Sequence, residues 1–225
     1  MIKALQSGFI QEQIQMITDE RTKHLASRKA VLVGTNMYAN LGETLPHDRK
    51  SSNSSNATAK SGDNLITATP LKAIRLSEPF EILRSNAEAY LKANDKRPQI
   101  FLANFGTLPE YKARMEFTRG FYEVGGFDLI DKGGFESIDP AMQAIISSGA
   151  SAIVICSTDK KYVEIVPEFV QTIKAQQPDM TVILAGYPKD KLDEYKQAGV
   201  DDFIHIRANC YAMNSDMQDK LGVGK

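Results

Sequence analysis

Cysteine and histidine, two residue types well suited to nucleophilic and metal chemistry, are scarce in this sequence. The chain has two cysteines among 225 residues, and one of them, Cys156, ends the apolar run Ile153–Cys156. A nucleophilic thiol needs an adjacent base or a cationic environment to lower its pKa from about 8.5. The three histidines, His24, His47 and His205, form no recognisable partner motif. We therefore expect Cys156 to be a buried and inert thiol.

A second candidate site follows the apolar run Ile100–Asn104. In α/β proteins, ligands usually bind where a strand ends and the next helix begins. Here Gly106 leads into Thr107-Leu-Pro-Glu110, which fits the capping box, a threonine followed three residues later by glutamate. Because Thr107 and Glu110 would satisfy the helix end with the protein's own side chains, the pattern favours a structural cap over a ligand-binding loop.

The remaining loops carry weaker signals. Ser157, Thr158 and Asp159 suit a turn and a helix N-cap, and Ala185–Gly186 suits a tight turn. His205 alternates with apolar residues. We therefore expect its ring nitrogens to be hydrogen-bonded within the protein at the end of the sheet and not to bind a metal. The sequence contains no GxGxxG, P-loop, HExxH or GxSxG pattern, and its cysteines lack metal-ligand spacing.

The elements that position these residues alternate regularly from residue 98 onward. Five short strands that alternate with helices indicate a doubly wound parallel sheet, with a flavodoxin-like strand order as the leading expectation. The expected strands are Ile100–Asn104, Phe127–Asp131, Ala152–Cys156, Thr181–Ala185 and Phe203–Ile206, with helices near 109–123, 140–148, 160–175, 189–197 and 210–221.

The first part of the chain is less regular. Residues 9–27 have the pattern of an amphipathic helix, and Ala30–Gly34 has that of a strand buried on both faces. Residues 43–75 resemble a flexible linker, because Ser51–Asn56 is polar and of low complexity. A connecting helix is expected within 76–97. The lone strand either docks on the later domain or pairs with a sheet on a missing piece of chain, and we favour the missing piece.

The bulk composition narrows the classes of partner. The net charge is −1, from 27 basic and 28 acidic residues, which argues against nucleic acid or an anionic membrane as partner. No stretch approaches the roughly 20 apolar residues of a membrane span, and the N-terminus lacks the apolar segment of a signal peptide. We expect a cytoplasmic protein.

Several stretches together resemble the small subunit of adenosylcobalamin-dependent methylmalonyl-CoA mutase. They are Glu78–Arg84, Phe101–Gly106, Ser148–Asp159, Val182–Pro188 and Ala198–Ile204. The resemblance covers the chain from about residue 76 and implies that 98–225 form a cobalamin-binding-like α/β domain. Residues 1–42 are similar to the last helix and strand of that family's CoA-binding (β/α)8 barrel. This implies the C-terminal part of a longer subunit, and the sequence leaves open whether Met1 is a true start or a truncation.

The same resemblance implies a heterodimer of propionate metabolism whose large subunit binds adenosylcobalamin. In that family the cobalamin domain carries an Asp-x-His-x-x-Gly loop, and Leu108, Glu110 and Ala113 stand at those three positions here. Cys156–Thr158 takes the place of a serine-containing loop, and Ala185–Gly186 that of a Gly-Gly pair. These departures imply that the chain binds no cobalamin and no metal, has no catalytic residue, and supports the large subunit structurally.

Two alternatives stay open at this point. One is a functional cobalamin-binding module that uses a base-on mode, in which the missing histidine would not matter. The glycine-poor loops at 107–113 and 185–186 weigh against it. The other is a receiver-like signalling domain, which needs clustered acidic residues at the end of the first strand. The chain has Asn104-Phe-Gly-Thr107 there.

Overall fold

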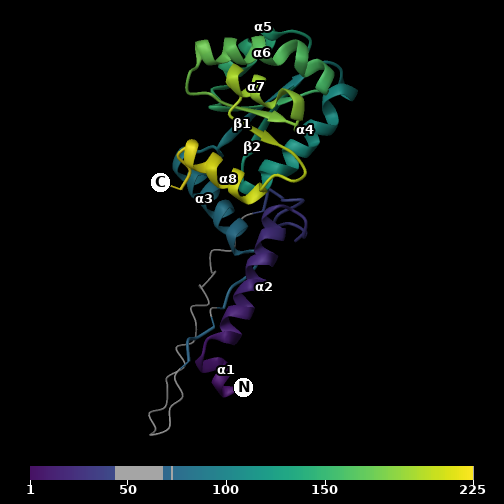
Figure 1. The fold of residues 1–225 in the computed structure, drawn as a ribbon. Coiled ribbons are helices and arrows are strands. Elements are labelled where there is room, and N and C mark those ends of the chain that lie inside the picture. The colour runs from purple at the N-terminus through teal and green to yellow at the C-terminus, as the bar shows by residue number, and fades with distance from the viewer. Residues whose placement is uncertain (44–67, 72, 225) are drawn as a thin grey trace.

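Five parallel strands form a single sheet in a computed structural model that describes residues 1–43, 68–71 and 73–224 (Figure 1). Their order is β2-β1-β3-β4-β5, and every neighbouring pair is parallel. The bounds are β1 Gln99–Phe105, β2 Asp128–Phe135, β3 Ala152–Cys156, β4 Thr181–Ala185 and β5 Asp202–Ile204. This order confirms the predicted flavodoxin-like, doubly wound sheet.

Helices cover both faces of the sheet. Helices α5, α6 and α7 pack on one face, and α4 and α8 pack on the other, with α3 beside α8. The bounds are α3 Glu78–Asn94, α4 Leu108–Tyr122, α5 Ile138–Ser148, α6 Asp159–Gln176, α7 Leu192–Ala198 and α8 Cys210–Lys220, with two short 3-10 helices, η1 Glu123–Gly125 and η2 Lys189–Lys191.

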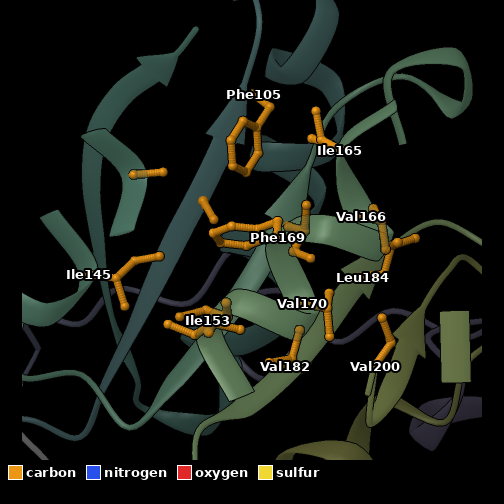
Figure 2. Close-up of a cluster of buried hydrophobic side chains, with 14 of the residues drawn as sticks. Phe105, Ile145, Ile153, Ile165, Val166, Phe169, Val170, Val182, Leu184 and Val200 are labelled. Carbon is orange, nitrogen blue, oxygen red and sulfur yellow. The ribbon is translucent and has the colours of Figure 1, made fainter. Parts of the chain in front are cut away.

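The apolar runs form the central strands because both of their faces are covered. All five residues of β3 and of β4 are buried. On the face under α6, Phe169 meets Phe105 edge to face with ring centroids 5.0 Å apart (Figure 2). Fully burying one large apolar side chain contributes about 1.5–3 kcal/mol, so this layer is a major source of stability.

The strand predictions hold best in the middle of the sheet. Strands β3 and β4 begin and end at the predicted residues, whereas β2 continues to Phe135. Strand β5 ends at Ile204, so His205 and Ile206 lie in the following loop and not in the predicted strand. Strand β4 ends at Ala185, which pairs with Ile204, so β4 offers β5 no pairing residue beyond Ile204.

The N-terminal helices project away from the α/β domain (Figure 1). They are α1 Ile2–Gln6 and α2 Phe9–Ala26, which confirms the helix predicted at 9–27. Helix α2 buries only Leu25 and Ala26, both at its C-terminal end. Its apolar residues Ile14 and Ile17 stay 43% and 57% exposed. A lone helix of this length is marginal in water, because most helices in proteins are stabilised by packing of an apolar face. Helix α2 lacks much of that packing here.

The predicted strand at Ala30–Gly34 is wrong. The segment forms a turn closed by one isolated bridge between Val33 and Met37. The fully buried Asn36 replaces the missing strand partner: its amide nitrogen donates to two backbone carbonyls, and its oxygen accepts the N–H of Leu32 at 2.8 Å. Because these groups are satisfied locally, the apolar run needs no sheet to form its hydrogen bonds.

Arginines hold the segment that follows against the α/β domain. Arg84 of α3 donates to the carbonyl oxygen of Asn40 at 3.0 Å, and Arg97 donates to that of Leu41 at 2.9 Å. Hydrogen bonds from ionised donors are stronger than neutral ones. The segment before residue 44 therefore docks on the later domain, and the expectation that a missing piece of chain would complete the N-terminal part stays a prediction.

Only part of the predicted linker at 43–75 is described. Residues 44–67 and 72 lie outside the described residues, and with them His47 and the stretch Ser51–Asn56. In the described part, the carbonyl oxygen of Thr69 accepts from the Gln11 side chain of α2 at 2.8 Å. Within the described ranges no helix is both long enough and apolar enough to cross a membrane.

Candidate functional site

The strand order locates the candidate site. In a 2-1-3-4-5 sheet the connections diverge between β1 and β3, and ligands of such folds bind in the crevice at the carboxyl ends of these two strands. In this chain the crevice is bordered by the loops after β1 and β3, with the loop after β4 beside them. Residues 106–110, 157–161 and 185–188 are therefore the ones to consider.

The loop after β1 is closed by the predicted capping box. One carboxylate oxygen of Glu110 accepts from the backbone N–H of Thr107 at 2.7 Å and from its hydroxyl at 2.8 Å. The Thr107 backbone N–H, followed by the hydroxyl, holds the pKa of Glu110 below its usual value. Gly106 has a φ of 91°, and a Cβ there would lie 2.5 Å from the same carboxylate oxygen. Glu110 thus fills the space that the glycine leaves.

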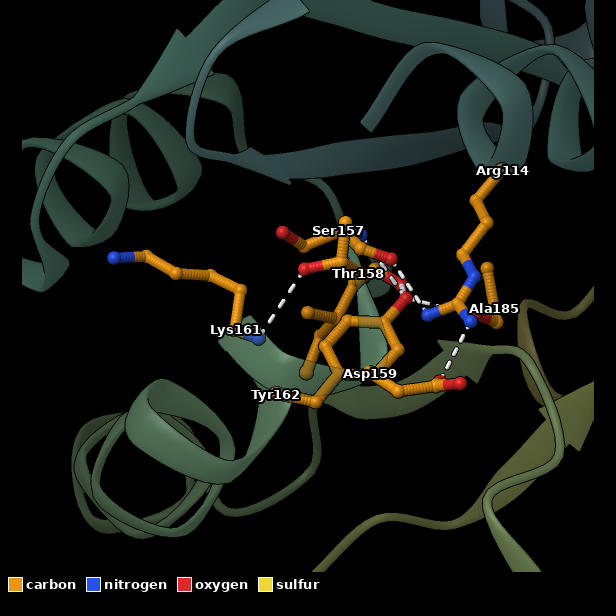
Figure 3. Close-up of polar contacts among 8 residues, drawn as sticks. Arg114, Ser157, Thr158, Asp159, Lys161, Tyr162 and Ala185 are labelled. Atoms are coloured by element: carbon orange, nitrogen blue, oxygen red, sulfur yellow. Dashed lines mark hydrogen bonds and ion pairs between the residues drawn. The ribbon is translucent and has the colours of Figure 1, made fainter. Parts of the chain in front are cut away.

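A single arginine spans the crevice (Figure 3). Arg114 of α4 donates through Nη1 to the carbonyl oxygen of Ser157 and through Nη2 to the Asp159 carboxylate, each at 2.6 Å. Its guanidinium carbon lies 4.8 Å from the centre of the Tyr162 ring, within the range of a cation–π contact. The side chain therefore links α4 to the end of β3 and to the first turn of α6.

Beneath the arginine, Tyr162 and Ser157 join the ends of three strands. The Tyr162 hydroxyl accepts the Ser157 backbone N–H at 3.0 Å and lies 2.7 Å from the carbonyl oxygen of Ala185, to which it donates. The Ser157 hydroxyl donates to the carbonyl oxygen of Phe105 at 2.7 Å. Burial raises the pKa of Tyr162 far above its usual value, so the phenol stays a neutral donor. Strands β1, β3 and β4 are thereby tied together at this edge.

These contacts leave little for a ligand to bind. The N–H, hydroxyl and carbonyl of Ser157 each already have a protein partner. A Cβ at Gly186 would lie 3.3 Å from the guanidinium carbon of Arg114, so the arginine also covers the start of the loop after β4. The arrangement is that of a crevice closed by its own polar groups.

Cys156 is fully buried at the end of β3, as expected. Its sulfur lies 3.5 Å from the Thr118 hydroxyl of α4. Burial raises the pKa of the Cys156 thiol to about 12, and the Thr118 hydrogen bond opposes this only in part. A thiol in this state is protonated at neutral pH and is a poor nucleophile.

The other predicted positions are spread along the same edge. Leu108 and Ala113 lie exposed on α4, with Leu108 53% exposed. Thr158 caps α6 as predicted, because its hydroxyl accepts the Lys161 N–H at 3.2 Å. The structure brings Ser157, Ala185 and Gly186 together around Arg114 and Tyr162, whereas Leu108 and Ala113 point to solvent on α4.

His205 lies apart from this network. Its Nδ1 accepts the Arg207 backbone N–H at 3.2 Å, and its ring lies 4.6 Å from that of Tyr187. Partial burial, followed by the charge of Arg207, lowers the pKa of His205. No group of three His, Cys, Asp or Glu side chains in the described part of the chain could hold a metal ion.

The sequence did not single out Arg114 and Tyr162, although these two residues organise the site. Tyr162 shares the buried stripe of α6 with Ile165 and Phe169, and Arg114 follows the buried Tyr111 by three residues on α4. A polar side chain on an inward-facing stripe must find a partner. That placement was the available signal, but it could not say which strand end each group would reach.

A family model described as methylmalonyl-CoA mutase matches residues 1–73. The methylmalonyl-CoA mutase small subunit of Porphyromonas gingivalis is 25% identical over 225 residues, covering 98% of this chain and 34% of the relative. The corresponding small subunit of Streptomyces virginiae is 26% identical, covering 99% of this chain and 33% of the relative. The chain thus spans about a third of the length of the curated relatives that it matches.

Two solved structures are similar to part of this chain. A cobalamin-binding protein from Desulfitobacterium hafniense is 20% identical with a TM-score of 0.46, covering 64% of this chain and 68% of that one. The receiver domain of a sensor histidine kinase from Pseudomonas aeruginosa is 14% identical with a TM-score of 0.41, covering 56% and 98%.

The burial of Cys156 and Cys210 predicts the behaviour of both thiols. With each pKa raised to about 12 by burial, neither thiol should react with Ellman's reagent at pH 8 in the native protein. Unfolding in guanidinium chloride should expose both within the mixing time. Rapid modification of Cys156 in the native state, measured by mass spectrometry, would contradict this account and revive a nucleophilic role.

The contact between Gly106 and Glu110 predicts a specific loss of stability. Gly106→Ala should lower the free energy of unfolding by about 2–3 kcal/mol, because it combines a strained backbone with a displaced cap. Gly133→Ala is the matched control: Gly133 has a similar φ of 83°, but a Cβ there meets nothing within 4 Å. It should cost only about 1 kcal/mol. Equal losses in denaturant unfolding would show that the Glu110 contact contributes nothing.

Proposed function

The chain is a relative of the small subunit of methylmalonyl-CoA mutase, and we propose that it is a noncatalytic, structural part of such a subunit. In this proposal its partner is a large subunit that carries adenosylcobalamin and interconverts methylmalonyl-CoA and succinyl-CoA in the cytoplasm. The partner and the reaction follow from the family resemblance, since the relatives are named as small subunits of this mutase.

One observation carries the noncatalytic part of the proposal. The crevice between β1 and β3, where this fold places its ligands, is spanned by Arg114 and lined by strand-end groups that already have protein partners. A ligand entering there would have to displace the hydrogen bond from the ionised Arg114 guanidinium to the carbonyl oxygen of Ser157 and leave that buried acceptor unpaired. Such losses are expensive, so the geometry supports a closed site.

The residues at the family's cobalamin positions do not fit that cofactor. Glu110 stands where an imidazole would bind cobalt, and its carboxylate is already hydrogen-bonded to Thr107. Leu108 places an apolar side chain at the position of a conserved family acid. We therefore propose that the chain itself binds no cobalamin, and that the cofactor belongs to the partner.

The N-terminal part would complete a neighbouring domain. The family model matches residues 1–73, and the relatives are about three times as long as this chain. We propose that residues 1–42 belong to the end of a CoA-binding barrel, whose remaining part would cover the exposed Ile14 and Ile17 of α2. In this proposal the acyl-CoA substrate is bound by the remaining part of the barrel and not by the described residues of this chain.

Titration with adenosylcobalamin tests the closed site. Absorbance and calorimetry should show no heat and an unshifted corrin spectrum at cofactor concentrations on the order of 100 μM, well above the dissociation constants of typical specific sites. Saturable binding would overturn the proposal. A base-on spectrum would then favour the alternative of a cobalamin-carrying module, and a base-off spectrum would point to ligation by a protein side chain.

A pair of variants separates a missing ligand from a closed crevice. Glu110→His restores an imidazole at the family position, and Glu110→Gln loses the same carboxylate without adding a cobalt ligand. If the crevice is closed by Arg114, both variants should remain unable to bind adenosylcobalamin. Binding by Glu110→His alone would show that only the ligand is missing, and it would contradict the closed crevice.

A further inference from the structure

A groove of about 270 Å³ lies between the N-terminal segment and the α/β domain, away from the β1/β3 crevice. Three parts of the chain line it: the turn after α2, helix α4 and the loop after β5. The residues that carry the argument are Arg28, Met37, Phe117, Phe121, His205 and Ile206. The volume is close to the lower end of the range of about 300–1,000 Å³ typical of small-molecule sites.

The groove contains a cation without an anionic partner. The Arg28 guanidinium lies over the rings of Phe117 and Phe121, 5.5 Å and 5.8 Å from their centroids. Across residues 1–43, 68–71 and 73–224 no carboxylate pairs with Arg28, and its Nη1 is buried without a hydrogen-bond partner. A buried N–H donor without an acceptor is costly, so an acceptor that reaches this guanidinium would stabilise it.

The neighbouring polar groups do not supply that anion. The Cys210 thiol lies within hydrogen-bonding reach of the Arg28 guanidinium, but burial dominates and raises the pKa of the thiol to about 12, so it stays neutral. A neutral thiol is also a weak hydrogen-bond acceptor. His205, on the other wall, has a pKa lowered by burial and by Arg207, and it contributes no negative charge in either form.

Arg28 lies just after the end of α2, which sets its backbone conformation. Its φ of 59° is left-handed, a conformation that residues other than glycine adopt rarely. This conformation is common just after a helix C-terminus, and here the Arg28 N–H donates to the carbonyl oxygen of Leu25 at 3.0 Å. The helix end thus directs the Arg28 side chain away from α2, and its contacts with Phe117 and Phe121 place the guanidinium at the wall of the groove.

We propose that this groove binds a small carboxylate with an apolar body, whose carboxylate pairs with Arg28 and whose body lies against Phe117, Phe121 and the exposed Ile206. A carboxylate matches the planar donors of a guanidinium and can accept two of its N–H groups. The apolar body would cover side chains that water now reaches, since Ile206 is 80% exposed. The proposal is independent of a role in a mutase, because it rests only on residues of the groove.

Calorimetry with simple probes tests the proposal. Benzoate and hexanoate serve as carboxylates, benzamide as the neutral isostere of benzoate, and inorganic phosphate as an anion without an apolar body. At least one carboxylate should saturate a single site with a Kd on the order of 1 mM or tighter. Benzamide and phosphate should bind at least tenfold more weakly. Failure of both carboxylates to saturate, or equal binding of benzamide, would overturn the proposal.

Variants then locate the site. Arg28→Gln should weaken carboxylate binding at least tenfold, while the matched control Arg21→Gln, on the exposed face of α2, should leave it unchanged. Unchanged binding by Arg28→Gln would overturn the proposal. In nitrogen–proton correlation spectra of the full chain, the shifts caused by benzoate should centre on Phe117, Phe121 and Ile206.

A second variant keeps the test valid if Arg28→Gln fails to fold. Ile206→Glu places a carboxylate at the rim of the groove, where it should compete for Arg28 and weaken benzoate binding severalfold. Because Ile206 is 80% exposed, this change should not disturb the core. Ile146→Glu, at a 45% exposed position on α5, is the matched control. Equal affinities of these two variants would show that the carboxylate binds elsewhere.

Discussion

The closed edge of the sheet depends on the charge of one guanidinium. Arg114 reaches from α4 over the end of β3, and its two hydrogen bonds of 2.6 Å end on different elements, a loop carbonyl and the first residue of α6. The carbonyl would otherwise face a crevice with no donor, and Asp159 would lose its cationic partner. A buried acceptor without a donor costs about 1–3 kcal/mol, so the arginine makes the closed arrangement stable.

Tyr162 and Ser157 extend this hydrogen-bond network across the ends of three strands. The Tyr162 hydroxyl reaches backbone groups at the ends of β3 and β4, and Ser157 carries the connection on to β1. These groups are the ones that a ligand would use in a fold of this kind. The polar groups of Ser157 and Tyr162 are therefore bonded within the protein, which is consistent with a structural role in a larger assembly.

Hydrogen bonds from arginine to backbone carbonyl oxygens also attach the N-terminal segment to the α/β domain. Arg84 and Arg97 donate to carbonyl oxygens of the segment that precedes residue 44, so ionised donors again satisfy backbone that has no sheet partner. Arg28 differs from them, because its guanidinium rests on aromatic rings, its Nη1 has no hydrogen-bond partner, and the Cys210 thiol beside it is neutral and a weak acceptor. That contrast separates a structural arginine from one that can still take a ligand.

The sequence predicted the fold where patterns are local. The apolar runs of β3 and β4 and the capping box at Thr107 depend on neighbouring residues, and the structure has them as expected. The run Ala30–Gly34 misled because its hydropathy matches a buried strand, while the buried Asn36 amide takes the place of a partner. The reach of Arg114 to Ser157 could not be predicted, since it joins residues 43 positions apart in the chain.

Native-state hydrogen exchange at the Ser157 amide tests the closed crevice most directly. This N–H is bonded to the Tyr162 hydroxyl, so it can exchange only when the network opens. If the crevice is closed as described, Ser157 will exchange with the same free energy of opening as the core amide of Val154, through global unfolding. Exchange of Ser157 by a low-energy local opening, with Val154 still protected, would contradict the account.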